Sequence, residues 1–261
     1  MTMLDILEKL ALEAGKAILD VYHAGPNVTY KDDCSPVTEA DERAEAIILA
    51  GLRQAFPEIP VVAEEEAAAG RIPDIAGKCF FLVDPLDGTK EFINRRDDFT
   101  VNIALVEDGT PVAGIVYAPA RKVAYAGGAN GAVKMEIGDN QEVVRREKIG
   151  CRARSETLTA VASRSHNSPE TEAFLAAKGI TSTTSVGSSL KFCLVAEGSA
   201  DVYPRFGRTM EWDTAAGDAV LRAAGGVTLD TEGKPFRYGK TKQATDSDFA
   251  NGHFIAWGFQ P

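Results

Sequence analysis

The 261-residue sequence lacks several features that would assign it to a class of protein at once. It has no apolar run near the roughly 18 to 20 residues that a bilayer-spanning helix needs. We see no basic and apolar segments of a secretion signal at the N-terminus and no internal repeat. Positive charge is also in deficit, because 38 acidic residues outnumber 28 basic ones and give a net charge of −10. That balance opposes binding to nucleic acid or to an anionic membrane.

Cysteine is scarce, and no Cys-x-x-Cys pair occurs. The four residues are Cys34, Cys79, Cys151 and Cys193. Their spacing favours buried thiols in a reducing compartment over a disulfide framework or a zinc site. We therefore expect a cytoplasmic protein, with peripheral association with the inner membrane left open. Hydrophobic content of 44% and charged content of 25% are typical of a globular enzyme.

The hydrophobic pattern predicts an α+β first part. Residues 3–22 carry a helical stripe, and a second helix follows Thr38. Strands are expected at 60–63, 80–83, 100–106, 112–118, 123–126 and 132–137. Asp108 and Gly109 are a strong hairpin signal between two of these strands. The polar stretch 138–155 is the best candidate for a domain boundary.

Beyond that boundary the pattern changes to alternating strands and helices. Strands are expected at 159–162, 181–184, 200–206, 227–229 and 254–257, and helices at 169–178, 188–197 and 212–224. Two layered halves fit this order, an α+β half over residues 1–150 and an α/β half over residues 151–261. The first half would carry most of the candidate metal ligands, and the second would carry the substrate-binding residues.

The most informative segment, residues 84–91, directly follows a strongly apolar predicted strand. Two carboxylates, Asp84 and Asp87, therefore stand close together at the end of that predicted strand. We expect Pro85 to end the sheet pairing and Gly88 to permit a tight turn. Anionic oxygens suit a hard cation, and the free amides of a turn suit a phosphate. An Asp-rich turn with a helix cap is the simpler alternative.

Further acidic residues stand at predicted strand ends or helix starts, where ligand sites gather in layered sheets. Glu64 begins an acidic triplet, and by spacing alone Glu65 and Glu66 are equally good ligands. Asp213 opens a helix, where a first-turn acid is favourable in any case. Converging carboxylates about 4 Å apart repel by roughly 4 kcal/mol at an effective dielectric constant of 20, so they need cations or protons. Ligands that offer only oxygen favour Mg²⁺ or Mn²⁺ over zinc.

Other segments have the character of anion-binding elements, although each has an ordinary structural explanation. Residues 163–166 and 187–191 offer hydroxyls, charged side chains and amides next to predicted helices, and Arg205 ends a strand. Helix capping by serine is the alternative. The sequence from Thr38 to Asp41 has the pattern of a capping box. Gly217 costs about 1 kcal/mol relative to alanine inside a helix, which a close helix contact or an approach to the acidic turn would explain.

Four of these segments resemble the signatures of the inositol monophosphatase superfamily of metal-dependent, lithium-sensitive phosphatases. They are Asp84-Pro-Leu-Asp-Gly-Thr89, Glu211-Trp-Asp-Thr-Ala-Ala-Gly-Asp218, Val61-Val-Ala-Glu-Glu65 and Pro36-Val-Thr-Glu-Ala-Asp41. Their order and spacing agree across nearly the whole chain. The resemblance implies an α/β (α+β) fold, the layered αβαβα sandwich of the sugar phosphatases.

Within the superfamily, the chain is similar to the 3'(2'),5'-bisphosphate nucleotidases. The similar segments are Thr89-Lys-Glu-Phe-Ile93, Ser163-Arg-Ser-His166, Gly187-Ser-Ser-Leu-Lys-Phe192 and Asp201-Val-Tyr-Pro-Arg205. Arg208 stands where the family pattern has proline.

The resemblance also implies the roles of individual residues. Mg²⁺, as two ions or three and with Mn²⁺ as a substitute, would be held by Glu64, Asp84, Asp87, Asp213 and the backbone carbonyl of Leu86. Asp41 and Thr89 would form the dyad that activates water. Gly88, Thr89 and Asp213 would contact the transferred phosphoryl group. The non-scissile phosphate or sugar would be held by His166, Ser188, Lys191 and Arg205.

The reaction implied by the resemblance is hydrolysis of the 3'-phosphate of adenosine 3',5'-bisphosphate, and also of 3'-phosphoadenylyl sulfate, in sulfur assimilation or nucleotide recycling. Hydrolysis of inositol-1-phosphate or of another sugar phosphate is the alternative within enzymes. A non-catalytic phosphometabolite sensor is the alternative of another class, although a pure binder needs no water-activating pair. The expected partner is a small phosphorylated nucleotide, not a nucleic acid, and the expected state is a monomer or a homodimer.

Overall fold

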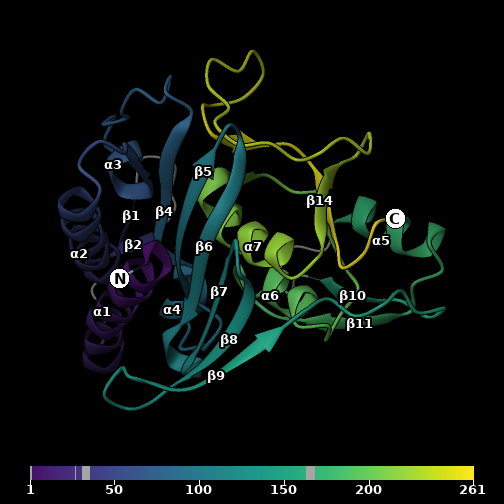
Figure 1. Cartoon of the computed structure of the whole chain (residues 1–261), viewed down its shortest axis with the longest axis horizontal. Helices are drawn as coiled ribbons and strands as arrows, with labels where there is room; N and C mark the ends of the chain where they lie inside the picture. The colour runs from purple at the N-terminus through teal and green to yellow at the C-terminus, as the bar shows by residue number, and fades with distance from the viewer. Residues whose placement is uncertain (1, 27, 31–35, 163–167) are drawn as a thin grey trace.

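Five alternating layers of helices and strands make up the fold (Figure 1). The computed structural model describes residues 2–26, 28–30, 36–162 and 168–261. α1 (Met3–Ala24) and α2 (Glu39–Ala55) pack on one face of a seven-stranded sheet. α6 (Leu190–Ala196) and α7 (Glu211–Ala223) lie between that sheet and a five-stranded sheet, and α5 (Pro169–Ala177) packs on the outer face of the second sheet. The predicted αβαβα sandwich is confirmed.

The first sheet is antiparallel except at one edge, where β3 runs parallel to β4. Its strands, in spatial order, are β3 (Val61–Ala63), β4 (Cys79–Asp87), β5 (Thr100–Glu107), β6 (Thr110–Ala118), β7 (Val123–Gly128), β8 (Gly131–Ile137) and β9 (Val143–Ile149). The predicted hairpin joins β5 to β6, and both Asp108 and Gly109 have positive φ, 47° and 74°. Strand β9 lies inside the polar stretch 138–155 and was not predicted. As an edge strand it carries charged residues on exposed positions, so its sequence shows no apolar alternation.

The acidic turn departs from the expectation for Pro85. Strand β4 continues past it, since Asp84 pairs with Asn102 and Asp87 pairs with Thr100, with a shift of register between them. The expectation that pairing ends at Pro85 was therefore wrong. A bulge takes this residue, which has no N–H to donate, out of the hydrogen-bond ladder.

The second sheet is mixed, with order β11-β10-β12-β16-β14. Its strands are β10 (Thr159–Ala162), β11 (Ser182–Ser185), β12 (Val202–Arg205), β14 (Val227–Asp230) and β16 (Phe254–Trp257). Two small antiparallel pairs join β1 (Val28–Tyr30) to β2 (Pro36–Thr38) and β13 (Thr209–Met210) to β15 (Ala250–Asn251). The short helices are α3 (Glu64–Ala68), α4 (Thr89–Ile93) and η1 (Pro119–Arg121). The division into domains at residue 150 stays a prediction.

The cysteines and helices of the described ranges bear on the predicted class of protein. Cys79, Cys151 and Cys193 are free, as expected, and Cys34 lies outside the described residues. Throughout those ranges, each helix is too short or too polar to pass through a bilayer.

Close contact between α7 and the first sheet depends on glycines. A Cβ added at Gly114 would lie 2.9 Å from the carbonyl oxygen of Ala216, and one added at Gly127 would lie 2.6 Å from the Cα of Val220. Gly217 faces α6, because its added Cβ would lie 2.6 Å from the ring of Phe192. The close helix contact is thus the explanation of this glycine.

We expect Gly127→Ala to lower the free energy of unfolding by roughly 1–3 kcal/mol, because the added methyl group would push the backbone of α7 away from β7. Urea-induced unfolding measures the change. Gly77→Ala is the matched control, since no atom lies within 4 Å of its added Cβ. Equal stability of the two variants would contradict the packing argument.

Candidate active site

Asp41 and Thr89, the predicted dyad, lie next to each other. The Thr89 hydroxyl is 3.4 Å from Oδ1 of Asp41 and 3.3 Å from the carbonyl oxygen of Leu86. The other oxygen of Asp41 accepts hydrogen bonds of 2.8 Å from both the N–H and the hydroxyl of Thr38. Asp41 therefore caps α2 with one oxygen and faces Thr89 with the other, so the capping box and the dyad coexist.

The turn after β4 is shaped by its own backbone contacts. The Leu86 N–H donates to Oδ1 of Asp84 at 3.0 Å. Gly88 has a φ of 92°, and a Cβ at this position would meet the hydroxyl of Ser188 and the backbone of Phe99. Only glycine fits there without strain, and α4 begins at the next residue.

The loop before α6 connects this turn to α7. The Ser188 hydroxyl donates to the backbone carbonyl of Asp87 at 2.9 Å, and the Ser189 N–H donates to the Asp87 carboxylate at 2.8 Å. The Ser189 hydroxyl donates to the carbonyl of Asp213 at 2.5 Å. The Gly187 N–H is also used, by the carboxylate of Asp98 at 2.8 Å. Amides that the sequence left free for a phosphate are thus bonded to protein carboxylates, and the substrate role of Ser188 stays a prediction.

Contacts of α3 constrain the acidic triplet. The amides of Glu65 and Glu66 donate to the buried carboxylate of Glu45, at 2.8 and 3.0 Å. The Glu66 side chain pairs with Arg53 at 2.6 Å. Glu64, by contrast, raises the pKa values of Asp84 and of other acids through its negative charge. The charge of Glu64 therefore acts on the acidic cluster, and its choice as the metal ligand of the triplet stays a prediction.

The acids of the cluster disturb one another. Burial, followed by the charges of neighbouring carboxylates, raises the pKa of Asp84 and that of Asp213 well above the usual range. Burial raises the pKa of Asp87 to about 6, although Lys191 and the Ser189 N–H oppose the shift. Burial also raises the pKa of Asp41 to about 6. Acids from β4, α2, α3 and α7 therefore lie close enough to repel one another.

Within the described ranges, no group of three or more His, Cys, Asp or Glu side chains is arranged closely enough to hold a metal ion as it stands. The chemistry of the cluster nevertheless fits a hard divalent cation. Its donors are oxygens, they are buried, and their mutual repulsion would be relieved by positive charge.

A cavity of about 130 Å³ is lined by acids of the cluster and by cationic side chains. The predicted residues that line it are Asp87, Gly88, Ser188, Lys191, Arg205 and Asp213. The Lys191 ammonium group is buried and donates to the carbonyl of Ser188 at 2.9 Å. Burial lowers its pKa to about 8, and the charge of Arg205 adds to this effect. The Nε atom of Arg205 is buried without a partner in the described part of the chain. His166 lies outside the described residues.

Several lining residues were not predicted. They are Glu91, Arg96, Asp98, Phe192, Tyr203, Thr209 and Thr214. Asp98 is only 1% exposed and pairs with Arg121 at 2.5 Å while it accepts the Gly187 N–H. A charged residue two positions before a buried strand was the available signal, but the sequence does not show which loop it holds.

Arg208, found where the family has proline, faces away from this cavity. Its guanidinium donates to Asp246 at 3.1 Å and to the Ser247 hydroxyl at 2.7 Å. It lines a second cavity of about 410 Å³, which also contains Glu64 and Asp213. Its backbone carbonyl accepts a hydrogen bond from Arg205 at 3.2 Å. Arg208 therefore contacts the first cavity's lining through Arg205, and it shares the second cavity with Asp213.

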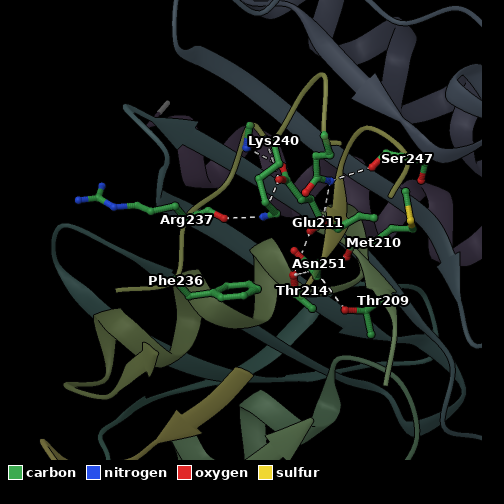
Figure 2. A network of polar contacts seen from close by, with 12 residues as sticks. Thr209, Met210, Glu211, Thr214, Phe236, Arg237, Lys240, Ser247 and Asn251 are labelled. Atoms are coloured by element: carbon green, nitrogen blue, oxygen red, sulfur yellow. Dashed lines mark hydrogen bonds and ion pairs between the residues drawn. The ribbon is translucent and has the colours of Figure 1, made fainter. Parts of the chain in front are cut away.

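A polar network holds the first turn of α7 (Figure 2). Asp213 stands in that turn. The Asn251 amide donates to the Thr209 hydroxyl, to the Met210 carbonyl and to the Thr214 hydroxyl, at 3.1, 2.8 and 3.0 Å. The buried carboxylate of Glu211 accepts the N–H of Lys240 at 2.9 Å and pairs with its ammonium group at 2.7 Å. These contacts fasten the segment after β14 to the start of the helix.

The fold and the acidic site together define a phosphatase-like α/β protein, and comparison with protein families makes this specific. The model of the inositol monophosphatase family matches residues 1–256, and the chain belongs to that family.

Particular relatives refine the placement. The chain is 48% identical over 238 residues to the 3'(2'),5'-bisphosphate nucleotidase CysQ of Salmonella typhimurium, which covers 90% of this chain and 94% of that protein. The chain is 47% identical over 238 residues to the 3'(2'),5'-bisphosphate nucleotidase CysQ of Escherichia coli K12, and this match again covers 90% of this chain and 94% of that protein. Among solved structures, CysQ from Bacteroides thetaiotaomicron superposes with a TM-score of 0.78 at 40% identity, covering 97% of this chain and 95% of that one. The IMPase of Thermotoga maritima gives a TM-score of 0.77 at 25% identity, with coverage of 99% and 92%.

We expect Asp84→Asn to raise the free energy of unfolding by roughly 1–3 kcal/mol at pH 7.5 in the presence of a chelator. The amide oxygen can still accept the Leu86 N–H, while the buried charge is removed. Because the folded-state pKa of this acid lies above its unfolded value, it costs stability as the pH rises, so the gain should be smaller at pH 4.5. Urea unfolding at the two pH values measures it.

Asp74→Asn is the matched control for this substitution. Asp74 is exposed and likewise accepts the N–H of the second residue after it, Ala76, at 2.9 Å. Its replacement should change the free energy of unfolding by no more than about 0.5 kcal/mol. Destabilisation by Asp84→Asn at pH 7.5 would show that burial and repulsion do not dominate at this site.

Proposed function

We propose that the chain is a 3'(2'),5'-bisphosphate nucleotidase that hydrolyses the 3'-phosphate of adenosine 3',5'-bisphosphate to AMP and phosphate. One observation carries the proposal: a single cavity is lined both by acids of the cluster, Asp87 and Asp213, and by a buried lysine and an arginine. A substrate with two phosphates can use both sets of residues, whereas a monophosphate has no second anionic group for the cations. The similarity to CysQ proteins over most of the chain supports the same choice.

The metal would be held by oxygens of the acidic cluster. The proposed ligands are Glu64, Asp84, Asp87, Asp213 and the Leu86 carbonyl. Bound Mg²⁺, as two or three ions or with Mn²⁺ in its place, would neutralise the carboxylates and polarise the phosphoryl oxygens. The raised pKa values of the buried acids support this assignment, because burial and neighbouring negative charge disfavour their ionised forms, and bound cations would favour those forms.

The residues around the turn would position and activate water. The Thr89 hydroxyl orients the attacking water, and Asp41 takes its proton. A carboxyl whose pKa is about 6 suits this role near neutral pH, because it is mostly ionised yet basic enough to accept a proton. The amides of Gly88 and Thr89 would hold oxygens of the transferred phosphoryl group.

Lys191 and Arg205 would bind the phosphate that is not cleaved. Lys191 brings a buried positive charge, and Arg205 brings a guanidinium whose Nε lacks a partner among the described residues. Arginine can bind a phosphate through two parallel hydrogen bonds, which would satisfy this donor. The enclosed volume of about 130 Å³ is below the roughly 300–1,000 Å³ of a typical small-molecule site, so part of the nucleotide would extend beyond it. A cytoplasmic location and a monomeric or dimeric state stay predictions.

Phosphate release from adenosine 3',5'-bisphosphate should require Mg²⁺, and Asp87→Asn should lower kcat by at least about 100-fold. The substitution removes a carboxylate that lies both in the cavity and in the acidic cluster. A colorimetric phosphate assay with Mg²⁺, with chelator and with added lithium tests this. Undiminished turnover in chelator would refute the metal-dependent mechanism, and ligand binding without turnover would favour the sensor.

Lys191→Ala should lower kcat/KM for adenosine 3',5'-bisphosphate by roughly 10–100-fold, since it removes a charge-assisted contact with the second phosphate. It should leave hydrolysis of inositol-1-phosphate, which has no such group, within about twofold of the unsubstituted protein. Comparison of kcat/KM for the two substrates decides. Equal losses on both, or faster hydrolysis of inositol-1-phosphate by the unsubstituted protein, would favour the sugar-phosphatase alternative.

A further inference from the structure

Arg96 lines the same cavity, and its backbone is fixed from two sides. Its N–H donates to the carbonyl of Glu91 at 2.9 Å, which ties it to α4. Its carbonyl accepts the hydroxyl of Tyr22 from α1 at 3.3 Å. The residue is therefore held at the cavity wall although its side chain is exposed.

The guanidinium of Arg96 forms no hydrogen bond or ion pair with any residue in the described ranges. The nearby arginines differ in this respect. Arg121 pairs with Asp97 and Asp98, and Arg208 pairs with Asp246. Arg96 thus keeps its full donor capacity at the edge of a cavity that we assign to an anionic substrate.

The acids that line the same cavity do not pair with the guanidinium of Arg96. Asp98 forms an ion pair with Arg121 and accepts a hydrogen bond from the Gly187 N–H. Asp87 accepts the Ser189 N–H, and Asp213 accepts the Met210 N–H at 2.8 Å. Glu91 also lines the wall, but it is not paired with Arg96. A ligand that brings its own negative charge is the partner that suits this guanidinium.

We propose that Arg96 is a specificity-determining residue that binds the non-scissile anionic group of the substrate together with Lys191 and Arg205. The inference rests on the proposed function and adds to it: recognition of the second phosphate would use a third cation at the rim. Because the side chain is exposed, its contribution should be smaller than that of the buried Lys191.

The test compares Arg96→Ala with Arg95→Ala. Arg95 is the adjacent arginine, it lies 5.0 Å from the centre of the Tyr22 ring, and it does not line the cavity. We expect Arg96→Ala to lower kcat/KM for adenosine 3',5'-bisphosphate roughly tenfold, mainly through KM, and to leave adenosine 3'-monophosphate within about twofold. Arg96→Lys should recover part of the loss, and Arg95→Ala should change neither substrate.

A binding measurement separates this role from a structural one. AMP, which keeps the 5'-phosphate, should inhibit Arg96→Ala roughly tenfold less well, whereas inhibition by adenosine should not change. Equal losses on the bisphosphate and the monophosphate, or equal behaviour of Arg96→Ala and Arg95→Ala, would overturn this inference alone. Failure of the unsubstituted protein to release phosphate from the bisphosphate would overturn the proposed function, and this inference with it.

Discussion

Repulsion between buried carboxylates is the constraint on which the rest of the site depends. Asp84 and Asp87 come from β4, Glu64 from α3 and Asp213 from α7, and burial together with like charge raises the pKa of each of the three aspartates. Such a cluster disfavours the folded chain unless protons or cations join it. Its elements would move apart if packing elsewhere did not hold them together.

Several of the holding contacts come from uncharged groups. Gly114 and Gly127 let α7 approach the first sheet, and Asn251 binds the first turn of that helix (Figure 2). The hydroxyl of Ser189 reaches Asp213 while its N–H reaches Asp87. One loop therefore spans two acids that repel each other, and the same loop leads into the helix that carries Lys191. This loop therefore couples the positions of Asp87 and Asp213 to the position of Lys191.

Elements with a regular pattern were predictable from sequence, and so was the family, because its motifs keep their order along the chain. Strand β9 was not, since an edge strand of charged residues has no apolar alternation. Spacing could not show how the acidic triplet is placed, because Glu45 and Arg53 contact α3 only in the folded chain. The position of Arg96 could not be predicted either. Arg95 stands beside it, and the sequence does not show which of the two arginines lines the cavity.

The charge of the protein couples the binding of metal to the binding of substrate. A net charge of −10 and the acids that line the cavity disfavour a polyanionic nucleotide. Under the proposed function, Lys191, Arg205 and Arg96 would attract one end of such a ligand, and the end to be cleaved would lie against Asp87 and Asp213. Under the proposed function, metal binding at the acids and nucleotide binding at the cations must therefore strengthen each other by the same factor, since coupling between two sites is reciprocal.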